Sequence, residues 1–211
     1  MIESGPMTES TPRRLVIAIT GATGTIYGVR VLQMLRQTDI ETYLVMSKWG
    51  VRTLVHETSY TVDQVQEMAT HTCSANDQGA KISSGSFQTS GMIVAPCSMK
   101  TLAAIATGLS DNLVHRAADV TLKERRKLVL VVREAPLNEV HLENMLKLAR
   151  MGVVISPPVP AFYNRPQTIE DIVDQTVMRL LDQFGIHLDE APRWDGMLSP
   201  GPKKVEVDSG H

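Results

Sequence analysis

Glycines and threonines that could bind an anion follow a short apolar run near the amino end of this 211-residue chain. Residues 16–19 are apolar at every position, as a strand inside a parallel sheet requires. Gly21 and Gly24 come next, and glycine lets a ligand approach the backbone closely. Hydroxyl donors are added by Thr20, Thr23 and Thr25. Because the first amides of a helix attract negative charge, this stretch predicts a nucleotide phosphate site, with a tight turn that binds no ligand as the alternative.

Polar side chains also follow each of the later apolar runs. Together with the first loop, these residues are Gly21, Ala22, Thr23, Ser47, Ser98, Met99, Lys100, Thr101, Arg133, Glu134 and Tyr163. Parallel strands end at a common edge, and ligands of such sheets bind beyond that edge, so we expect a pocket there. The alternative is that Ser47 and Ser98 only cap helices and that Arg133 and Glu134 form a surface pair.

Two further cations, Arg116 and Lys123, lie seven residues apart in a predicted helix. This spacing places them on nearly the same face, about two turns apart, where they could hold a phosphate. The mixed charges of residues 123–126 are also typical of a solvated helix face, and spacing alone favours that second interpretation.

Strand-like and helix-like segments alternate along the chain and must position these side chains. Apolar runs predict strands at residues 16–19, 41–46, 91–95, 128–132 and 153–155. Helical spacing of apolar residues predicts helices at residues 24–37, 47–57, 100–106, 112–126, 138–151 and 168–184. This alternation predicts an α/β fold with a mostly parallel sheet that helices cover on both faces. Residues 61–90 show the least regular pattern, and the serines at 83–86 favour a mobile surface loop.

Composition narrows the functional classes. A net charge of −2 argues against nucleic acid or an acidic membrane as a partner. Two cysteines, Cys73 and Cys97, are too few for a disulfide scaffold, and no long apolar segment predicts a spanning helix, so we expect a cytoplasmic protein. The six histidines lack metal-ligand spacing, so no metal site is expected. Residues 1–13 predict a flexible extension, 14–190 one domain and 191–211 a tail.

A glycine turn after a strand is also typical of nicotinamide-dependent oxidoreductases. That class normally ends its second strand with a charged residue for the ribose, whereas Ser47 stands here. None of the four tyrosines is followed by lysine four positions later, which the short-chain dehydrogenases supply. A small terminal phosphate such as that of FMN therefore fits this hydroxyl-rich edge better.

The chain resembles the flavin prenyltransferases of the UbiX type, a family formerly labelled aromatic acid decarboxylases, from about residue 14 to residue 194. The motifs that carry the resemblance are GATGTIYG, LVMSK, SSGSFQT, APCSMKTL, HRAADVTLKERR, LVVREAPL, ENMLKLARMG, PPVPAFYNRPQ and PRW. One departure is Thr23, where the family commonly has serine. The resemblance implies a Rossmann-like, three-layer flavoprotein fold.

The resemblance also implies an activity and its residues: joining the dimethylallyl group of dimethylallyl phosphate to reduced FMN, without a metal, for a partner decarboxylase. The implied FMN ligands are Gly21, Ala22, Thr23, Ser47, Ser98, Met99, Lys100, Thr101 and Arg133. The implied contacts to the prenyl phosphate are Tyr163 and Arg179, with Arg116 and Lys123 completing a cationic cradle. Glu57 and Glu134 match acidic residues placed to handle protons, and Glu134 is the expected base.

The resemblance further implies a homododecamer or another high-order homo-oligomer whose active sites form where subunits meet. Arg116 and Lys123 would then serve a neighbour's pocket. Two other functions stay open: an FMN-dependent decarboxylase that acts directly on an aromatic acid, and an FMN-binding subunit without turnover of its own.

Overall fold

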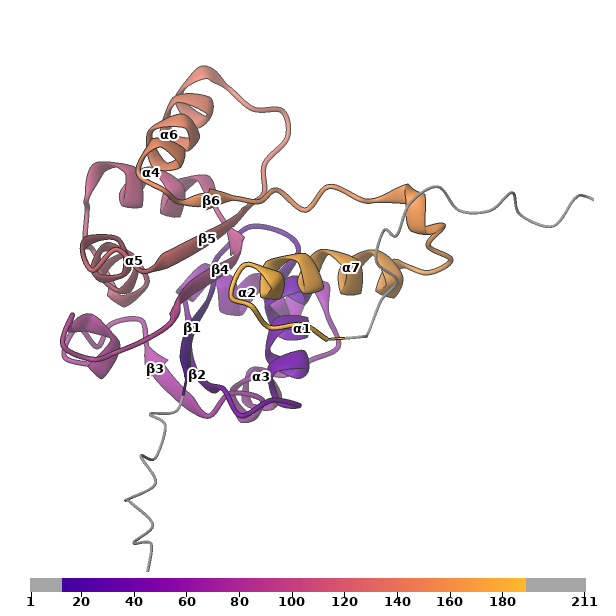
Figure 1. Cartoon of the computed structure of the whole chain (residues 1–211), viewed down its shortest axis with the longest axis horizontal. Coiled ribbons are helices and arrows are strands. Elements are labelled where there is room, and N and C mark those ends of the chain that lie inside the picture. Colours follow the sequence, from indigo (N-terminus) through magenta and orange to yellow (C-terminus); the bar gives the residue numbers. More distant parts are fainter. Residues whose placement is uncertain (1–12, 189–211) are drawn as a thin grey trace, which may run out of the picture.

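Six parallel strands form one sheet at the centre of the computed structural model, which describes residues 13–188 (Figure 1). The strands are β1 (Arg14–Ile19), β2 (Glu41–Met46), β3 (His71–Ser74), β4 (Gly91–Cys97), β5 (Lys127–Val132) and β6 (Val154–Ile155). Their order across the sheet is β3-β2-β1-β4-β5-β6, and all neighbours run parallel. The order reverses between β1 and β4, and at such a point an open sheet leaves a crevice beyond its carboxyl edge.

Helices connect the strands. They are α1 (Thr25–Leu35), α2 (Lys48–Glu57), α3 (Val62–Glu67), α4 (Met99–Thr107), α5 (Leu113–Lys123), α6 (Glu139–Arg150) and α7 (Ile169–Asp182). Short 3-10 turns are η1 (Lys81–Ser83) and η2 (Phe162–Asn164). Most α-helices begin at a residue whose side chain accepts a hydrogen bond from the first turn, and these caps are Ser47, Thr61, Ser98, Asn112, Asn138 and Thr168.

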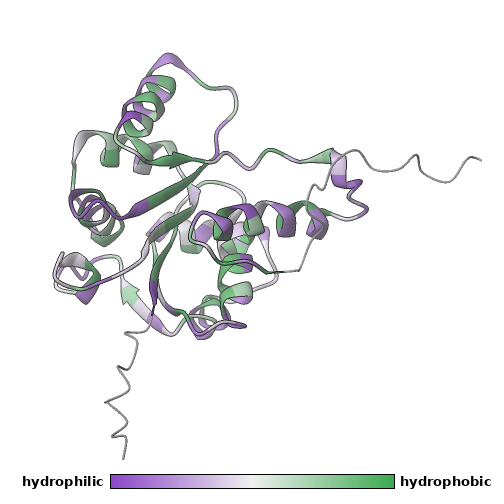
Figure 2. Ribbon diagram, in the orientation of Figure 1, coloured by the Kyte–Doolittle hydropathy of each residue, from purple (hydrophilic) through white to green (hydrophobic). Residues whose placement is uncertain are grey.

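Both faces of the sheet are buried, as β1 illustrates. Leu15, Ile17 and Ile19 belong to the hydrophobic core that α1 and α7 cover. Val16 and Ala18 face the opposite core, which α4 and α5 cover. Because successive side chains of a strand alternate between faces, a strand that is apolar at every position requires helices on both sides. Figure 2 accordingly shows hydrophobic colouring along most of β5.

The expected three-layer α/β fold is confirmed, and the predicted strands and helices are present with ends shifted by a few residues. Within the irregular residues 61–90, the structure contains α3 and the edge strand β3, which the sequence analysis did not predict. Three of the four β3 residues are exposed, so the strand lacks the apolar alternation that would reveal it.

The predicted extension at residues 1–13 and tail at residues 191–211 lie almost entirely outside the described residues, as does the PRW motif. No helix of the described residues is long and apolar enough to cross a membrane.

Candidate functional site

The loops that follow β1 and β4 are tied together at the carboxyl edge by the buried side chain of Thr20. Its hydroxyl donates to the carbonyl of Pro96 at 2.7 Å and accepts from the amide of Ser98 at 2.9 Å. The Thr20 amide also donates to the Pro96 carbonyl, at 3.2 Å. This double contact fixes the glycine loop against the start of α4, across the point where the strand order reverses.

The loops after β2 and β5 join the same edge. The Ser47 amide donates to the carbonyl of Ile19 at 3.0 Å, and the Arg133 amide donates to the carbonyl of Cys97 at 3.2 Å. The polar residues that the sequence analysis expected at the ends of four strands therefore lie along one rim of the sheet.

The start of α4 offers the clearest anion site at this rim. Ser98 caps the helix by accepting from the Thr101 amide at 3.3 Å, and it donates to the Thr101 hydroxyl at 3.1 Å. The first amides of a helix have no intrahelical partner, and the exposed cation of Lys100 stands in this first turn. Amides, hydroxyls and one cation together suit a phosphate.

Glycine is required where α2 crosses the rim. A Cβ atom on Gly21 would lie 2.4 Å from the Cβ atom of Trp49. Likewise, a Cβ atom on Gly28 of α1 would lie 2.3 Å from the Ala95 carbonyl of β4. The GATGTIYG motif thus holds two helices close to the strand ends, which is a packing role as well as a binding role.

The amides at the start of α1 are occupied by a carboxylate of the chain itself. Oε2 of Glu57 accepts from the Gly24 amide at 2.9 Å, the Thr25 amide at 3.2 Å and the Thr25 hydroxyl at 3.2 Å. A phosphate at the start of α1 stays a prediction, and there it would share these amides with a carboxylate of like charge.

These contacts change the acidity of Glu57. Burial disfavours its charged form, but hydrogen bonds from three successive residues, 23–25, outweigh burial and lower the pKa of Glu57 below its ordinary value. Glu57 is therefore a charged acceptor at neutral pH, fixed behind the glycine loop.

Glu134, the expected base, follows Arg133 at the same rim and is exposed. Its Oε1 atom accepts from the amide of Ala135 at 3.1 Å. Within residues 13–188, no ion pair joins Glu134 to Arg133 or to any other side chain. The surface pair that the sequence left open is thus not formed, and the carboxylate is available at the rim.

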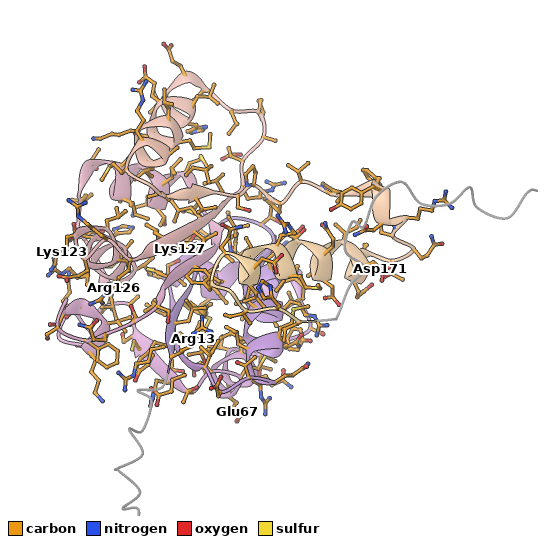
Figure 3. All side chains as sticks on the ribbon, viewed as in Figure 1. Arg13, Glu67, Lys123, Arg126, Lys127 and Asp171 are labelled. Carbon is orange, nitrogen blue, oxygen red and sulfur yellow. The ribbon has the colours of Figure 1, made fainter. Side chains whose placement is uncertain are left out.

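Arg116 and Lys123 lie on α5, and within residues 13–188 neither forms a hydrogen bond or ion pair with a rim residue. Arg116 donates from Nε to the Ser83 carbonyl at 3.1 Å and pairs with Asp119 at 2.7 Å. Lys123 pairs with Glu124 at the end of α5, four residues before β5 begins, and therefore near the amino edge of the sheet. Figure 3 shows Lys123 beside Arg126 at this end of α5.

Tyr163 in η2 and Arg179 on α7 form a third group, called the α7 group. The Gln175 side chain donates to the Tyr163 hydroxyl at 2.9 Å, and Arg179 follows Gln175 by four residues, hence on the same helix face. Arg179 pairs with Asp182 at 2.8 Å and its side chain is 63% exposed. The carbonyl of Gln183 accepts from Lys127 at the start of β5, so this end of α7 lies at the amino edge.

The predicted site residues thus fall into three groups: the rim group, the α5 group and the α7 group. One chain brings the rim group together, and within residues 13–188 no hydrogen bond or ion pair joins Arg116, Lys123 or Arg179 to it. Sequence reasoning did not single out Arg126, which reaches back about forty residues to loop 83–87, because nothing in a charged run reveals a contact at that distance along the chain.

Comparison with known proteins decides the family. The Flavoprotein family model matches residues 3–181. A probable UbiX-like flavin prenyltransferase from Bacillus subtilis (strain 168) is 61% identical over 184 residues, which cover 87% of this chain and 90% of that protein. The chain belongs to the UbiX-like flavin prenyltransferase family.

Two solved structures extend this likeness to the fold of the UbiX-like chain. The dodecameric FMN-dependent UbiX-like decarboxylase from Escherichia coli O157:H7 is 57% identical, with a TM-score of 0.86 over 87% of this chain and 100% of that one. AnUbiX, solved in complex with FMN and dimethylallyl pyrophosphate, is 53% identical, with a TM-score of 0.88 over 89% of this chain and 100% of that one. The resemblance read from the motifs is confirmed.

Thr23 is the position at which this UbiX-like chain departs from the usual serine. Its side chain is one of the donors to Glu57, so the hydroxyl function is retained. The additional methyl group of threonine restricts its χ1 rotamers. Among residues 13–188 there is no cluster of three or more histidine, cysteine or acidic side chains that could hold a metal ion.

Proposed function

We propose that this chain transfers the dimethylallyl group of dimethylallyl phosphate to reduced FMN, forming prenylated FMN for a partner decarboxylase. The observation that carries the proposal is the rim group, where amides, hydroxyls and cations converge at the switch point of a UbiX-like fold. Relatives of the same family support it, since AnUbiX was solved with both FMN and dimethylallyl pyrophosphate.

The rim has enough hydrogen-bond donors and positive charge to bind a flavin mononucleotide. Ser98, Met99, Lys100 and Thr101 would hold its phosphate at the start of α4, where a cap and a cation coincide. The remaining FMN ligands would be Gly21, Ala22, Thr23, Ser47 and Arg133. When bound in its reduced form, FMN supplies the electron-rich ring atoms that accept the prenyl group.

Negative charge builds on the phosphate oxygens as the allylic carbon–oxygen bond breaks. Arg116, Lys123, Tyr163 and Arg179 would stabilise that charge by donating hydrogen bonds to the leaving phosphate. Four such donors can supply this stabilisation without a metal ion, so we propose metal-independent turnover. Arg116, Lys123 and Arg179 each pair with a carboxylate of the chain, so each cation can reach an anion.

Ring closure releases a proton, and Glu134 is the proposed base. It is an exposed carboxylate at the rim with a single backbone contact, so it can accept a proton at Oε1 or Oε2 after the site closes around it. Glu57 would act through the Thr23 hydroxyl, since it faces the glycine loop from behind. Glu57 is thus proposed to exchange a proton with the reacting groups through the Thr23 hydroxyl.

The three groups reach one site only if subunits meet, because they lie on different parts of one chain. We propose a homododecamer or a similar homo-oligomer in which α5 and α7 of neighbouring subunits complete each rim. The relative from Escherichia coli O157:H7 is described as dodecameric, which supports this assembly.

The proposed recipient of the product is a decarboxylase that uses prenylated FMN. A cytoplasmic location is also proposed, because the chain has two free cysteines and no disulfide among its described residues.

The mass of the flavin after anaerobic incubation with reduced FMN and dimethylallyl phosphate tests the function. A gain of one isoprenyl unit is expected. Unchanged flavin together with carbon dioxide released from an aromatic acid would support the second candidate, a direct decarboxylase, which the description of the Escherichia coli O157:H7 relative favours. Unchanged flavin and no carbon dioxide would indicate a binding subunit.

A further inference from the structure

Three arginine hydrogen bonds hold loop 83–87 against α5. Arg126 donates from Nη1 to the carbonyl of Phe87 at 2.8 Å and from Nη2 to the carbonyl of Gly85 at 2.6 Å. Arg116 donates from Nε to the carbonyl of Ser83 at 3.1 Å. The sequence predicts a mobile loop here, and the structure gives its backbone an arginine contact at Ser83, Gly85 and Phe87.

Phe87 anchors the far end of the same loop. Its ring packs edge-on against Tyr43, with ring centroids 5.1 Å apart and planes 72° apart. The guanidinium of Arg14, the first residue of β1, lies 5.0 Å from the centre of the Phe87 ring. Aromatic and cation contacts of this kind add to the three hydrogen bonds, so the loop has one defined path.

The path of the loop places its hydroxyls next to the end of α5. Ser84 and Ser86 are exposed, and their hydroxyl oxygens lie 2.9 Å apart. Between them, a Cβ atom on Gly85 would lie 2.7 Å from Nζ of Lys123 and 2.1 Å from Oε1 of Glu124. The two hydroxyls therefore share one exposed polar surface with the Lys123 ammonium group and the Glu124 carboxylate that pairs with it.

We propose that Arg126 is a positioning residue for the phosphate end of the prenyl donor: it fixes loop 83–87 so that Ser84, Ser86 and Lys123 face the ligand together. This inference rests on the proposed function, in which Lys123 stabilises the leaving phosphate. Arg126 itself does not contact the ligand, because both of its Nη atoms are engaged by loop carbonyls.

The shape of the guanidinium explains why arginine is needed. Its planar fork donates to two carbonyls that lie two residues apart, while a lysine ammonium would satisfy them from a single flexible point. Charge-assisted bonds of this type are also stronger than bonds between neutral groups. Arg126→Lys should therefore retain part of the effect, and Arg126→Gln should lose it.

Steady-state kinetics of the full chain with reduced FMN and varied dimethylallyl phosphate provide the test. Arg126→Gln should raise KM for dimethylallyl phosphate about tenfold while kcat and the Kd of FMN change less than about twofold, with Arg126→Lys in between. Arg125→Gln is the matched control, because Arg125 is exposed and its side chain forms no hydrogen bond or ion pair within residues 13–188. An equal rise in KM for Arg125→Gln would show that only net charge matters and would overturn the proposal.

Two further measurements guard against a variant that fails to fold. Gly85→Ala leaves every arginine bond in place but displaces the ends of Lys123 and Glu124, and its backbone is outside the left-handed region, so KM should rise about as much. Hydrogen exchange of residues 83–87 should be faster in Arg126→Gln and unchanged in Arg125→Gln. Unchanged KM in Gly85→Ala and Arg126→Lys, or unchanged exchange, would contradict the inference. Absence of prenylated flavin with the unaltered chain would contradict the proposed function instead.

Discussion

The geometry of the glycine loop depends on the carboxylate of Glu57. Removing its charge in Glu57→Gln weakens the bonds to the start of α1, so we expect a loss of about 1 kcal/mol in the free energy of unfolding at pH 7. Glu67→Gln at the end of α3 is the matched control, because Glu67 is exposed and has no side-chain bond among the described residues. Chemical denaturation of both variants measures the difference, and equal losses would contradict this role.

The same carboxylate predicts a dependence on pH. Because folding lowers the pKa of Glu57, the unfolded chain binds the proton more tightly, and the stabilisation is complete above the unfolded pKa. It is lost as the pH falls through the lower, folded pKa. The stability difference between the unaltered chain and Glu57→Gln should therefore shrink toward acid pH, and a constant difference between neutral and acid pH would contradict the assignment.

Glu134 makes the prediction that bears most directly on the chemistry at this scale. Glu134→Gln keeps the size of the side chain and removes its basicity, so FMN should bind with unchanged Kd while product forms at least about a hundredfold more slowly. Flavin fluorescence measures the first quantity and flavin mass against time the second. An undiminished rate would assign the proton to another base.

At the scale of elements, the start of α4 should matter for FMN in a way that other caps do not. Ser98→Ala removes a helix cap and a proposed phosphate ligand, so it should cost about 1 kcal/mol of stability and weaken FMN binding about tenfold. Asn138→Ala removes the cap of α6 and should cost similar stability without affecting FMN. Equal effects of both variants on the Kd of FMN would contradict the placement of the anion site.

Much of this element pattern could be predicted from the sequence. Apolar runs such as residues 16–19 and 128–132 identify buried strands because a strand covered on both faces tolerates no polar position. The edge strand β3 escaped because its side chains are mostly exposed. The contact of Glu57 with the start of α1 could not be predicted either, because Glu57 lies 33 residues after Gly24 and such a contact leaves no local signal.

At the scale of the whole molecule, the sequence motifs name the residues of the proposed site, but spacing could not predict their grouping. Arg116, Lys123, Tyr163 and Arg179 lie on α5, η2 and α7. Their proposed assembly with the rim depends on surfaces of other copies of the chain, which no periodicity within one chain encodes. Only the resemblance to a family with shared sites supplied that expectation.

The proposed turnover without a metal ion can be tested with a chelator. Because the proposed donors to the leaving phosphate are side chains of Arg, Lys and Tyr, excess chelator should leave the rate of prenylated FMN formation unchanged. A loss of activity that added magnesium restores would show that a metal ion shares this role.

The central claim is that residues of different subunits meet at each flavin, and complementation in mixed oligomers tests it most directly. Lys123→Gln and Glu134→Gln chains, each inactive alone, are co-assembled in equal amounts and assayed for prenylated FMN. If the two residues serve one site from different chains, about one quarter of the sites contain both unaltered side chains, and activity returns to about that fraction of the unaltered level. If both residues serve a site from the same chain, no site is intact, and the mixed oligomers stay inactive.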